Sequence, residues 1–160
     1  MNIHIIVHSM TGKTKSFADL IFARLQTAGH IVNLTELKTK ETIKGGTVRQ
    51  KMDITFTNLP DVSSADLVMF GAPVWAFGPS PVIYQAMVKL GSQLKGKKIL
   101  PFFTMGFPYA WMGGNGAVNY MRRHAGTMGA RVLNGYVETG MRKGFEARME
   151  AKADEISKAL

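Results

Sequence analysis

The N-terminal stretch of the chain reads Ile3-His4-Ile5-Ile6-Val7-His8-Ser9-Met10-Thr11-Gly12-Lys13-Thr14. Its first half is an apolar run typical of a β-strand, and it breaks into a turn that contains glycine and several hydroxyl side chains. A helical pattern begins directly after this turn. Such a turn places backbone N–H groups and hydroxyls at a helix N-terminus, where unpaired donors and the helix dipole favour an anion. The stretch therefore predicts a strand, a phosphate-binding turn and a helix.

Hydrophobic patterns further along the chain predict an alternating series of strands and helices. The predicted strands after the first cover residues 31–37, 66–70, 98–104 and 131–138. The predicted helices cover residues 14–28, 80–90, 115–125 and 145–160, with Ser80 and Asn115 as N-caps and Gly91 as a C-terminal stop. Five alternations favour a parallel sheet with helices on both faces. A length of 160 residues suits one domain over residues 1–160.

Three places depart from this regular pattern. Segment 38–60 alternates more like an extended chain than a helix, and Gly45-Gly46 within it indicates a turn. Residues 61–65 are predicted to form a short turn of helix. Pro101 lies inside a predicted strand and cannot donate to a neighbouring strand, so we expect a bulge or an unpaired position there.

Composition excludes several classes of function. The chain has no cysteine, which rules out disulfides, a thiol nucleophile and cysteine-ligated metal clusters, so any redox chemistry must come from a bound cofactor. No apolar run approaches the ~20 residues that span a bilayer, and we expect a soluble, cytoplasmic protein without a membrane span.

The chain is basic, with a formal net charge of +9. This charge suits an acidic partner or a phosphorylated ligand. The cations are dispersed along the sequence, for example at Lys38, Arg49, Lys51, Lys98 and Arg131. Neither an aromatic RNA-binding strand nor a helix-turn-helix accompanies them, so we expect no nucleic-acid partner.

Three unusual loops follow the first, third and fourth predicted strands, at residues 8–14, 71–80 and 104–115. Because ligands of open α/β sheets bind outside the carboxyl ends of the strands, the three loops predict one shared site. Trp75, Phe77 and Trp111 could stack on a flat ring, and the glycines would let the backbone approach it. A helix cap and buried core aromatics are the alternative interpretation of these residues.

The tripeptide Gly12-Lys13-Thr14 also ends the P-loop of nucleotide triphosphatases, but the rest of that motif is missing. The P-loop needs a glycine where this chain has Val7, and the third strand ends in Phe70-Gly71 without an aspartate for magnesium. A phosphate monoester bound without metal fits the hydroxyl-rich turn better, and no metal ligands are predicted.

Three motifs together resemble those of flavodoxin-like proteins. Ser9-Met10-Thr11-Gly12-Lys13-Thr14 resembles the FMN-phosphate signature of flavodoxins, and Gly71-Ala72-Pro73-Val74-Trp75 resembles their second flavin loop. Thr104-Met105-Gly106 with Gly113-Gly114 is similar to the third loop of flavodoxin-like quinone reductases. The resemblance implies a flavodoxin-like three-layer sandwich with a five-stranded parallel sheet in the order 2-1-3-4-5.

The resemblance also implies an FMN site. The phosphate would be held by Ser9, Thr11, Gly12, Lys13 through its backbone amide, and Thr14, and Met10 in the same turn is also expected to contact the cofactor. The flavin ring would be lined by Pro73, Val74, Trp75, Ala76, Phe77, Gly78, Thr104, Met105, Gly106, Phe107, Trp111, Gly113 and Gly114. No side chain is expected to act as a catalytic acid or base.

Two departures from carrier flavodoxins bear on function. Those carriers are strongly acidic, whereas this chain is basic, and segment 38–60 does not show the expected second helix. The basic charge favours an FMN-dependent oxidoreductase that takes electrons from NAD(P)H and passes them to quinones or similar small-molecule acceptors. The alternatives are an electron carrier that docks to a redox partner protein, and an interaction module that has lost its flavin. The sequence leaves a homo-oligomer open.

Overall fold

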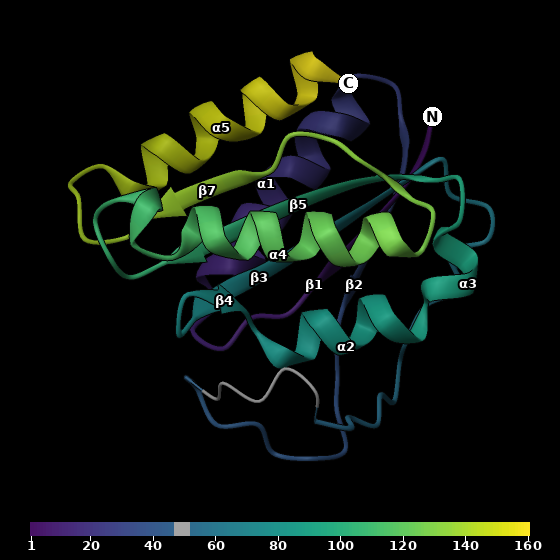
Figure 1. Ribbon diagram of the computed structural model, residues 1–160. Coiled ribbons are helices and arrows are strands. Elements are labelled where there is room, and N and C mark those ends of the chain that lie inside the picture. Colours follow the sequence, from purple (N-terminus) through teal and green to yellow (C-terminus); the bar gives the residue numbers. More distant parts are fainter. Residues whose placement is uncertain (47–51) are drawn as a thin grey trace.

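A central parallel sheet carries helices on both of its faces in the computed structural model, which describes residues 1–46 and 52–160 (Figure 1). The strands are β1 (Asn2–Val7), β2 (Ile31–Glu36), β3 (Leu67–Trp75), β4 (Gly78–Pro79), β5 (Lys98–Met105), β6 (Arg131–Val132) and β7 (Tyr136–Thr139). Their order is β2-β1-β3-β5, and both β6 and β7 pair with β5 in parallel. Since β6 and β7 together form the predicted fifth strand, the predicted order 2-1-3-4-5 is confirmed.

The helices are α1 (Lys13–Thr27), α2 (Pro81–Lys89), α3 (Gly91–Leu94), the 3₁₀ turn η1 (Ala110–Met112), α4 (Gly114–Thr127) and α5 (Phe145–Ala159). Side chains alternate along β1, so Ile3, Ile5 and Val7 pack with α1 and α5, while Ile6 packs on the other face with α2 and α4. Burial on both faces explains the near-continuous apolar run of β3. None of the helices in the described part of the chain is long and apolar enough to cross a membrane.

The predicted fifth strand is divided into β6 and β7, and the break lies opposite Pro101 of β5, which has no backbone N–H to donate. Pro101 pairs with Phe70 of β3 on one side, but on the other side β5 pairs with β6 only through Lys98 and Ile99. Pairing resumes with β7 at Phe102. The unpaired position predicted at Pro101 is therefore confirmed, because the missing donor faces the gap between β6 and β7.

Segment 38–60 is extended in its described parts, as predicted. Lys40 N–H donates to the Thr55 carbonyl at 2.9 Å, Thr57 N–H donates to the Lys38 carbonyl at 3.0 Å, and Thr39 forms an antiparallel bridge with Phe56. The side chain of Ile54 is fully buried. Arg49 and Lys51, which were counted among the dispersed cations, lie outside the described residues.

Four local predictions need correction. Residues 71–75 continue β3 instead of forming a loop, because Gly71–Pro73 stay paired with β5 and Val74 and Trp75 pair with β4. Residues 61–65 form only a turn, closed by Ala65 N–H on the Val62 carbonyl. Gly91 begins α3 instead of ending α2, whose C-cap is Leu90. The N-cap of α4 is Gly113, and Asn115 lies inside the first turn. By contrast, Ser80 is the N-cap of α2 as predicted.

Candidate binding site at the carboxyl edge of the sheet

Two adjoining cavities lie at the carboxyl ends of β1, β3 and β5. The first, of about 290 Å³, is lined by Met10, Thr11, Lys13, Thr14, Pro73, Val74, Trp75, Thr104, Met105 and Gly106. The second, of about 310 Å³, is lined by Val74, Ala76, Phe77, Met105, Gly106, Phe107, Met112 and Met141. Because they share Val74, Met105 and Gly106, they form one cleft, which we call the edge cleft. One end of it has hydroxyls and a lysine, and the other is apolar.

The turn between β1 and α1 is held in shape by its own hydrogen bonds. Gly12 adopts φ +86° as the N-cap of α1, a conformation that favours glycine. Its N–H donates to Ser9 Oγ at 3.1 Å, and its carbonyl accepts from Ser16 N–H at 2.9 Å. The Ser9 hydroxyl thus shapes the turn from inside, whereas Thr11 is exposed and lines the cleft.

A buried hydroxyl pair joins this turn to the end of β5. Thr14 Oγ1 and Thr104 Oγ1 lie 2.7 Å apart, and both side chains are buried. The two residues are 90 positions apart in sequence, so this hydrogen bond fixes the first and third predicted loops relative to each other. Lys13 lines the cleft, and its Nζ lies 5.4 Å from the centre of the Phe145 ring.

The hairpin between β3 and β4 forms the opposite wall of the cleft. Its two turn residues, Ala76 and Phe77, have φ values of +46° and +66°, which strains a residue that is not glycine. Phe77 is 69% exposed. The backbone at the start of α4 supports the hairpin from behind, since a Cβ on Gly113 would lie 3.1 Å from Phe77 Cα. Strained turns of this kind concentrate at functional sites.

His8 lies behind the cleft as a buried, neutral side chain. Its Nδ1 is 2.8 Å from Ser80 Oγ, and its ring meets Trp75 edge-on at a centroid distance of 5.4 Å. Burial lowers the pKa of His8 from 6.5 to about 4. His8 therefore links the first loop, the N-cap of α2 and the Trp75 ring without carrying a charge near neutral pH.

The structure brings most of the predicted site residues together but leaves several outside the cleft lining. Gly78 is buried in β4, where it pairs with Trp75. Gly114 packs its Cα against Val137 and Met105, and Gly113 supports the hairpin. Trp111, within η1, is 73% exposed, lies parallel to Tyr109 at a centroid distance of 6.0 Å, and lines a different pocket from the cleft.

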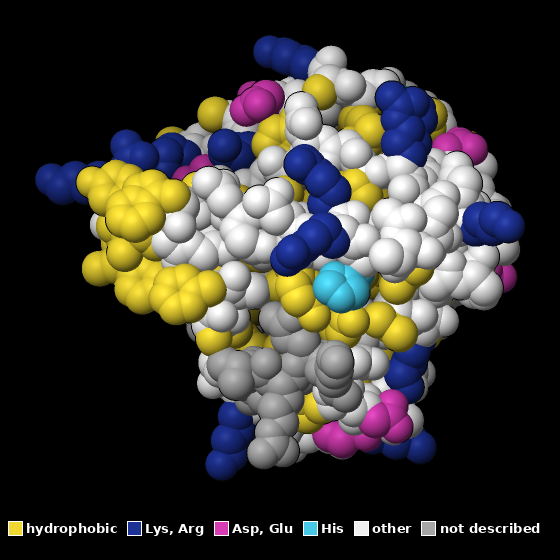
Figure 2. Space-filling view, in the orientation of Figure 1, with side chains coloured by type: hydrophobic (Ala, Val, Ile, Leu, Met, Phe, Trp, Pro, Cys, Tyr) yellow, Lys and Arg dark blue, Asp and Glu magenta, His cyan; other side chains and the backbone are white. Residues whose placement is uncertain are grey.

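Met141 lines the cleft although the sequence analysis did not select it. It lies in the segment after β7, whose Gly140 N–H donates to the Met105 carbonyl at 2.7 Å. The signal that could have found it is topological, because a fifth parallel strand also ends at this edge. Large hydrophobic side chains are exposed here, at Met10, Phe77, Phe107, Tyr109, Trp111 and Met141. Figure 2 shows hydrophobic side chains gathered at the left edge of the molecule, where the loops after β5 and β7 lie in Figure 1.

Among the described residues, no group of three or more His, Cys, Asp or Glu side chains is placed to hold a metal ion. The cleft instead offers backbone amides, threonine hydroxyls and an apolar slot. Such a site can hold a ligand that has an anionic end and a flat apolar end.

Comparison with known proteins supports the same fold. A family model described as flavodoxin-like fold matches residues 1–160. Solved structures with similar folds include a Megasphaera elsdenii flavodoxin, at 20% identity, TM-score 0.66 and 98% coverage of each chain. A putative flavoprotein from Bacteroides uniformis aligns at 15% identity and TM-score 0.74, covering 98% of this chain and 97% of that one.

A third similar structure is a flavoprotein from Lactobacillus acidophilus in complex with FMN. It aligns at 20% identity and TM-score 0.63, covering 85% of this chain and 91% of that chain. No curated protein sequence is detectably similar to this chain.

Proposed function

Because the chain belongs to the flavodoxin-like family, we propose that it is an FMN-binding redox protein and that the edge cleft is its FMN site. The observation that carries the proposal is the juxtaposition of the turn at 9–14 with the apolar slot between the β3–β4 hairpin and the end of β5. The FMN complex of the Lactobacillus acidophilus flavoprotein supports the choice of cofactor.

The residues of the cleft suit the three parts of FMN. Backbone amides and the Thr11 hydroxyl at the start of α1 would bind the phosphate, where the helix dipole favours an anion. The middle of the cleft, at the shared residues Val74, Met105 and Gly106, would take the ribityl linker. The apolar slot beyond it, lined by Phe77 of the hairpin, would take the ring, with Trp75 in the adjoining cavity beside it.

In this proposal the protein positions and shields the cofactor. FMN, when bound, supplies the transfer of hydride or single electrons. The Thr14–Thr104 pair holds the phosphate turn against the end of β5, and Gly113 holds the hairpin, so the cleft is formed before the ligand arrives. The described residues that line the cleft include no histidine and no carboxylate, and we assign none of them the role of an acid or base.

We further propose that the protein is an enzyme, an NAD(P)H-dependent oxidoreductase acting on quinones or similar acceptors. The net charge of +9 supports this choice, because positive charge attracts the phosphates of a dinucleotide. The methionines at 105, 112 and 141 line the slot and could adapt to different flat acceptors. The second candidate is an electron carrier with an acidic partner, which the exposed hydrophobic rim of the cleft favours.

Two measurements test these proposals in turn. The purified protein should show flavin absorption bands and release FMN on denaturation; a colourless protein that takes up no added FMN would contradict the first proposal. Stopped-flow mixing of the FMN-loaded protein with NADPH should then bleach the flavin promptly. Absence of bleaching, together with rapid reduction by a partner reductase, would identify a carrier instead.

A further inference from the structure

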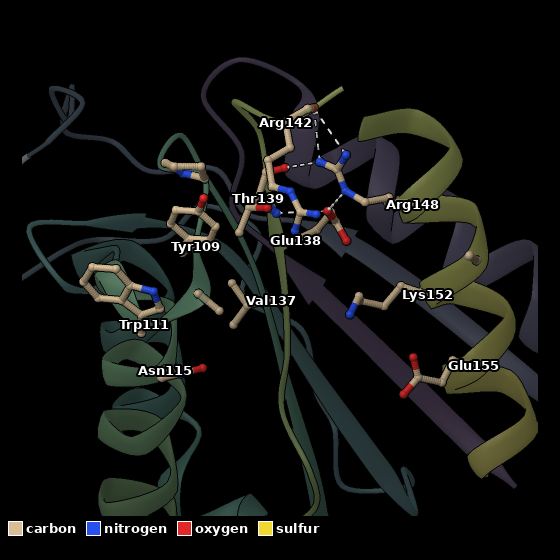
Figure 3. Close-up of a pocket in the computed structure, with 13 residues that line it drawn as sticks. Tyr109, Trp111, Asn115, Val137, Glu138, Thr139, Arg142, Arg148, Lys152 and Glu155 are labelled. Atoms are coloured by element: carbon tan, nitrogen blue, oxygen red, sulfur yellow. Dashed lines mark hydrogen bonds and ion pairs between the residues drawn. The ribbon is translucent and has the colours of Figure 1, made fainter. Parts of the chain in front are cut away.

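A second pocket, of about 500 Å³, lies on the far side of η1 from the edge cleft, and we call it the α5 pocket. It is lined by Pro108, Tyr109, Ala110, Trp111, Asn115, Val137, Glu138, Thr139, Arg142, Arg148, Ala151, Lys152 and Glu155. None of these residues lines the edge cleft. Figure 3 shows β7 running between two walls, with Trp111 and Asn115 on one side and Lys152 and Glu155 on α5 opposite.

The first wall is aromatic. The rings of Tyr109 and Trp111 are stacked nearly parallel, with an interplanar angle of 7°. The two side chains are 52% and 73% exposed. Large aromatic side chains that remain this exposed beside a hollow offer a flat surface for another ring. The indole also supplies an N–H donor, and the side chain of Asn115, in the first turn of α4, adds donors and an acceptor.

The opposite side of the pocket carries three cationic side chains, of which one is already bonded to neighbouring described residues and two are not. Arg148 is fully occupied: its Nε donates to Glu138 Oε1 at 2.7 Å, and its other nitrogens donate to carbonyls of residues 139, 142 and 143. Lys152 and Arg142 are different. Among the described residues, the Lys152 ammonium and the Arg142 guanidinium have no hydrogen-bond or ion-pair partner, and only the backbone carbonyl of Arg142 is engaged, by Arg148.

The charges of the lining therefore leave a net attraction for an anion. The lining carries three cations, Arg142, Arg148 and Lys152, against the two carboxylates of Glu138 and Glu155, and of these only Arg148 and Glu138 form an ion pair. Two unengaged cations, an indole N–H and an amide converge on a hollow large enough for a small organic ligand.

We propose that the α5 pocket binds an aromatic anion, meaning a flat ring that carries a phosphate or carboxylate group. The ring would lie against Trp111 and Tyr109, and Lys152 with Arg142 would bind the anionic group. This ligand is additional to FMN, and the proposal does not depend on FMN binding. A mononucleotide and a free aromatic acid share this chemistry.

The test is isothermal titration of the protein as purified and again with saturating FMN. AMP and salicylate serve as the two ring-bearing anions, and adenosine and inorganic phosphate supply the ring and the anion separately. We expect AMP or salicylate to bind at least tenfold more tightly than adenosine or phosphate, in both states of the protein. A preference for AMP indicates a nucleotide ligand, and a preference for salicylate indicates an aromatic acid.

Substitutions place the binding in this pocket. Lys152→Ala should weaken the preferred anion about threefold to tenfold, as for loss of one partly exposed charge contact. Trp111→Ala should weaken it at least fivefold, and Trp111→Phe should restore most of the loss. Lys158→Ala removes the same charge from the last turn of α5, outside the pocket, and should change nothing.

Far-ultraviolet circular dichroism and urea unfolding of each variant check that the fold is kept. The proposal is overturned if neither AMP nor salicylate binds at millimolar concentration, or if Lys158→Ala weakens binding as much as Lys152→Ala. Because the titration is also run without FMN, a failure to bind flavin would refute the proposed function, and the binding of AMP or salicylate to the α5 pocket would still be measured.

Discussion

The edge cleft and the α5 pocket lie on opposite sides of η1, yet they are built in different ways. The cleft is formed by backbone, by strand ends and by hydroxyls that already bond to each other, such as the Thr14–Thr104 pair. The pocket is formed by long side chains such as Lys152, for which no described residue provides a partner. A ligand entering the cleft meets a formed site, whereas a ligand in the pocket must order the side chains that bind it.

This difference predicts that a single substitution changes ligand binding or stability strongly in the cleft and only moderately in the pocket. In the cleft, a new charge would act directly on a bound anion, because the turn beside it is fixed by its own hydrogen bonds. In the pocket, a lost side chain removes one of several exposed contacts. Four experiments separate the two regions, and their expected effects decrease in the order given.

The largest effect is expected for Thr11→Asp in the phosphate turn. A carboxylate ~5 Å from a phosphate of charge about −2, at effective dielectric ~20, costs about 6 kcal/mol, which abolishes FMN binding at micromolar concentration. The measurement is FMN fluorescence titration of the apoprotein. Thr57→Asp, which adds the same charge at an exposed position away from the cleft, is the control. If Thr11→Asp keeps its FMN affinity, the phosphate does not bind at this turn.

Acid should lower the free energy of unfolding through His8, which is buried behind the cleft. No buried histidine lines the α5 pocket. The folded pKa of His8, about 4, lies below the ordinary 6.5, so the folded state binds fewer protons than the unfolded state between these values. The stabilisation from neutral His8 is therefore complete above pH 6.5 and is lost as the pH falls to 4. The loss amounts to about 3 kcal/mol.

Urea unfolding at pH 7 and pH 4 measures this loss. His8→Gln should lose about 3 kcal/mol less than the native chain over that interval, while His30→Gln should match the native chain. The pKa of His4 is also lowered by burial, but His4 is present in all three proteins, so its effect cancels. Equal acid losses in all three would mean that burial does not hold His8 neutral.

Sequence reasoning predicted the elements whose cause is local. The proline at 101 removes a donor wherever it lies, and Ser80 followed by Pro81 begins a helix in many contexts, so both features were predicted. The parallel sheet with helices on both faces followed from the alternation of elements, whereas the strand order came from the resemblance to flavodoxins. These rules need only the residue and its neighbours.

Features that depend on contacts distant in sequence were missed. Residues 71–75 were taken for a loop because glycine and proline usually break strands, but pairing with β5 and β4 keeps them extended. Asn115 was the better N-cap by residue type, yet the close approach to Phe77 and Val137 requires glycine at 113 and 114. Nothing in the sequence indicates that the Trp111 side chain lines the α5 pocket and not the edge cleft.

Gly114 lies where the two regions share a wall, so its substitution should affect both. A Cβ there would lie 2.5 Å from Val137 Cγ1, on the pocket side, and 3.0 Å from Met105 Sδ, on the cleft side. Gly114→Ala should therefore lower the free energy of unfolding by about 2 kcal/mol through overpacking. Gly106→Ala is the control, since a Cβ at that cleft position meets no atom within 4 Å. Denaturant titration that finds equal stability for both variants would contradict the close packing at Gly114.

The smallest effect, and the most direct test of the division between the regions, comes from the two tryptophans of the chain. Trp75 lines the cleft and Trp111 lines the pocket. Loss of one stacking surface is worth about 1 kcal/mol or more, so Trp75→Ala should weaken FMN about tenfold. Trp111→Ala should leave the FMN dissociation constant within about twofold. If both weaken FMN equally, the η1 turn moves Trp111 onto the flavin, as the sequence first suggested, and the aromatic wall of the α5 pocket belongs to the cofactor instead.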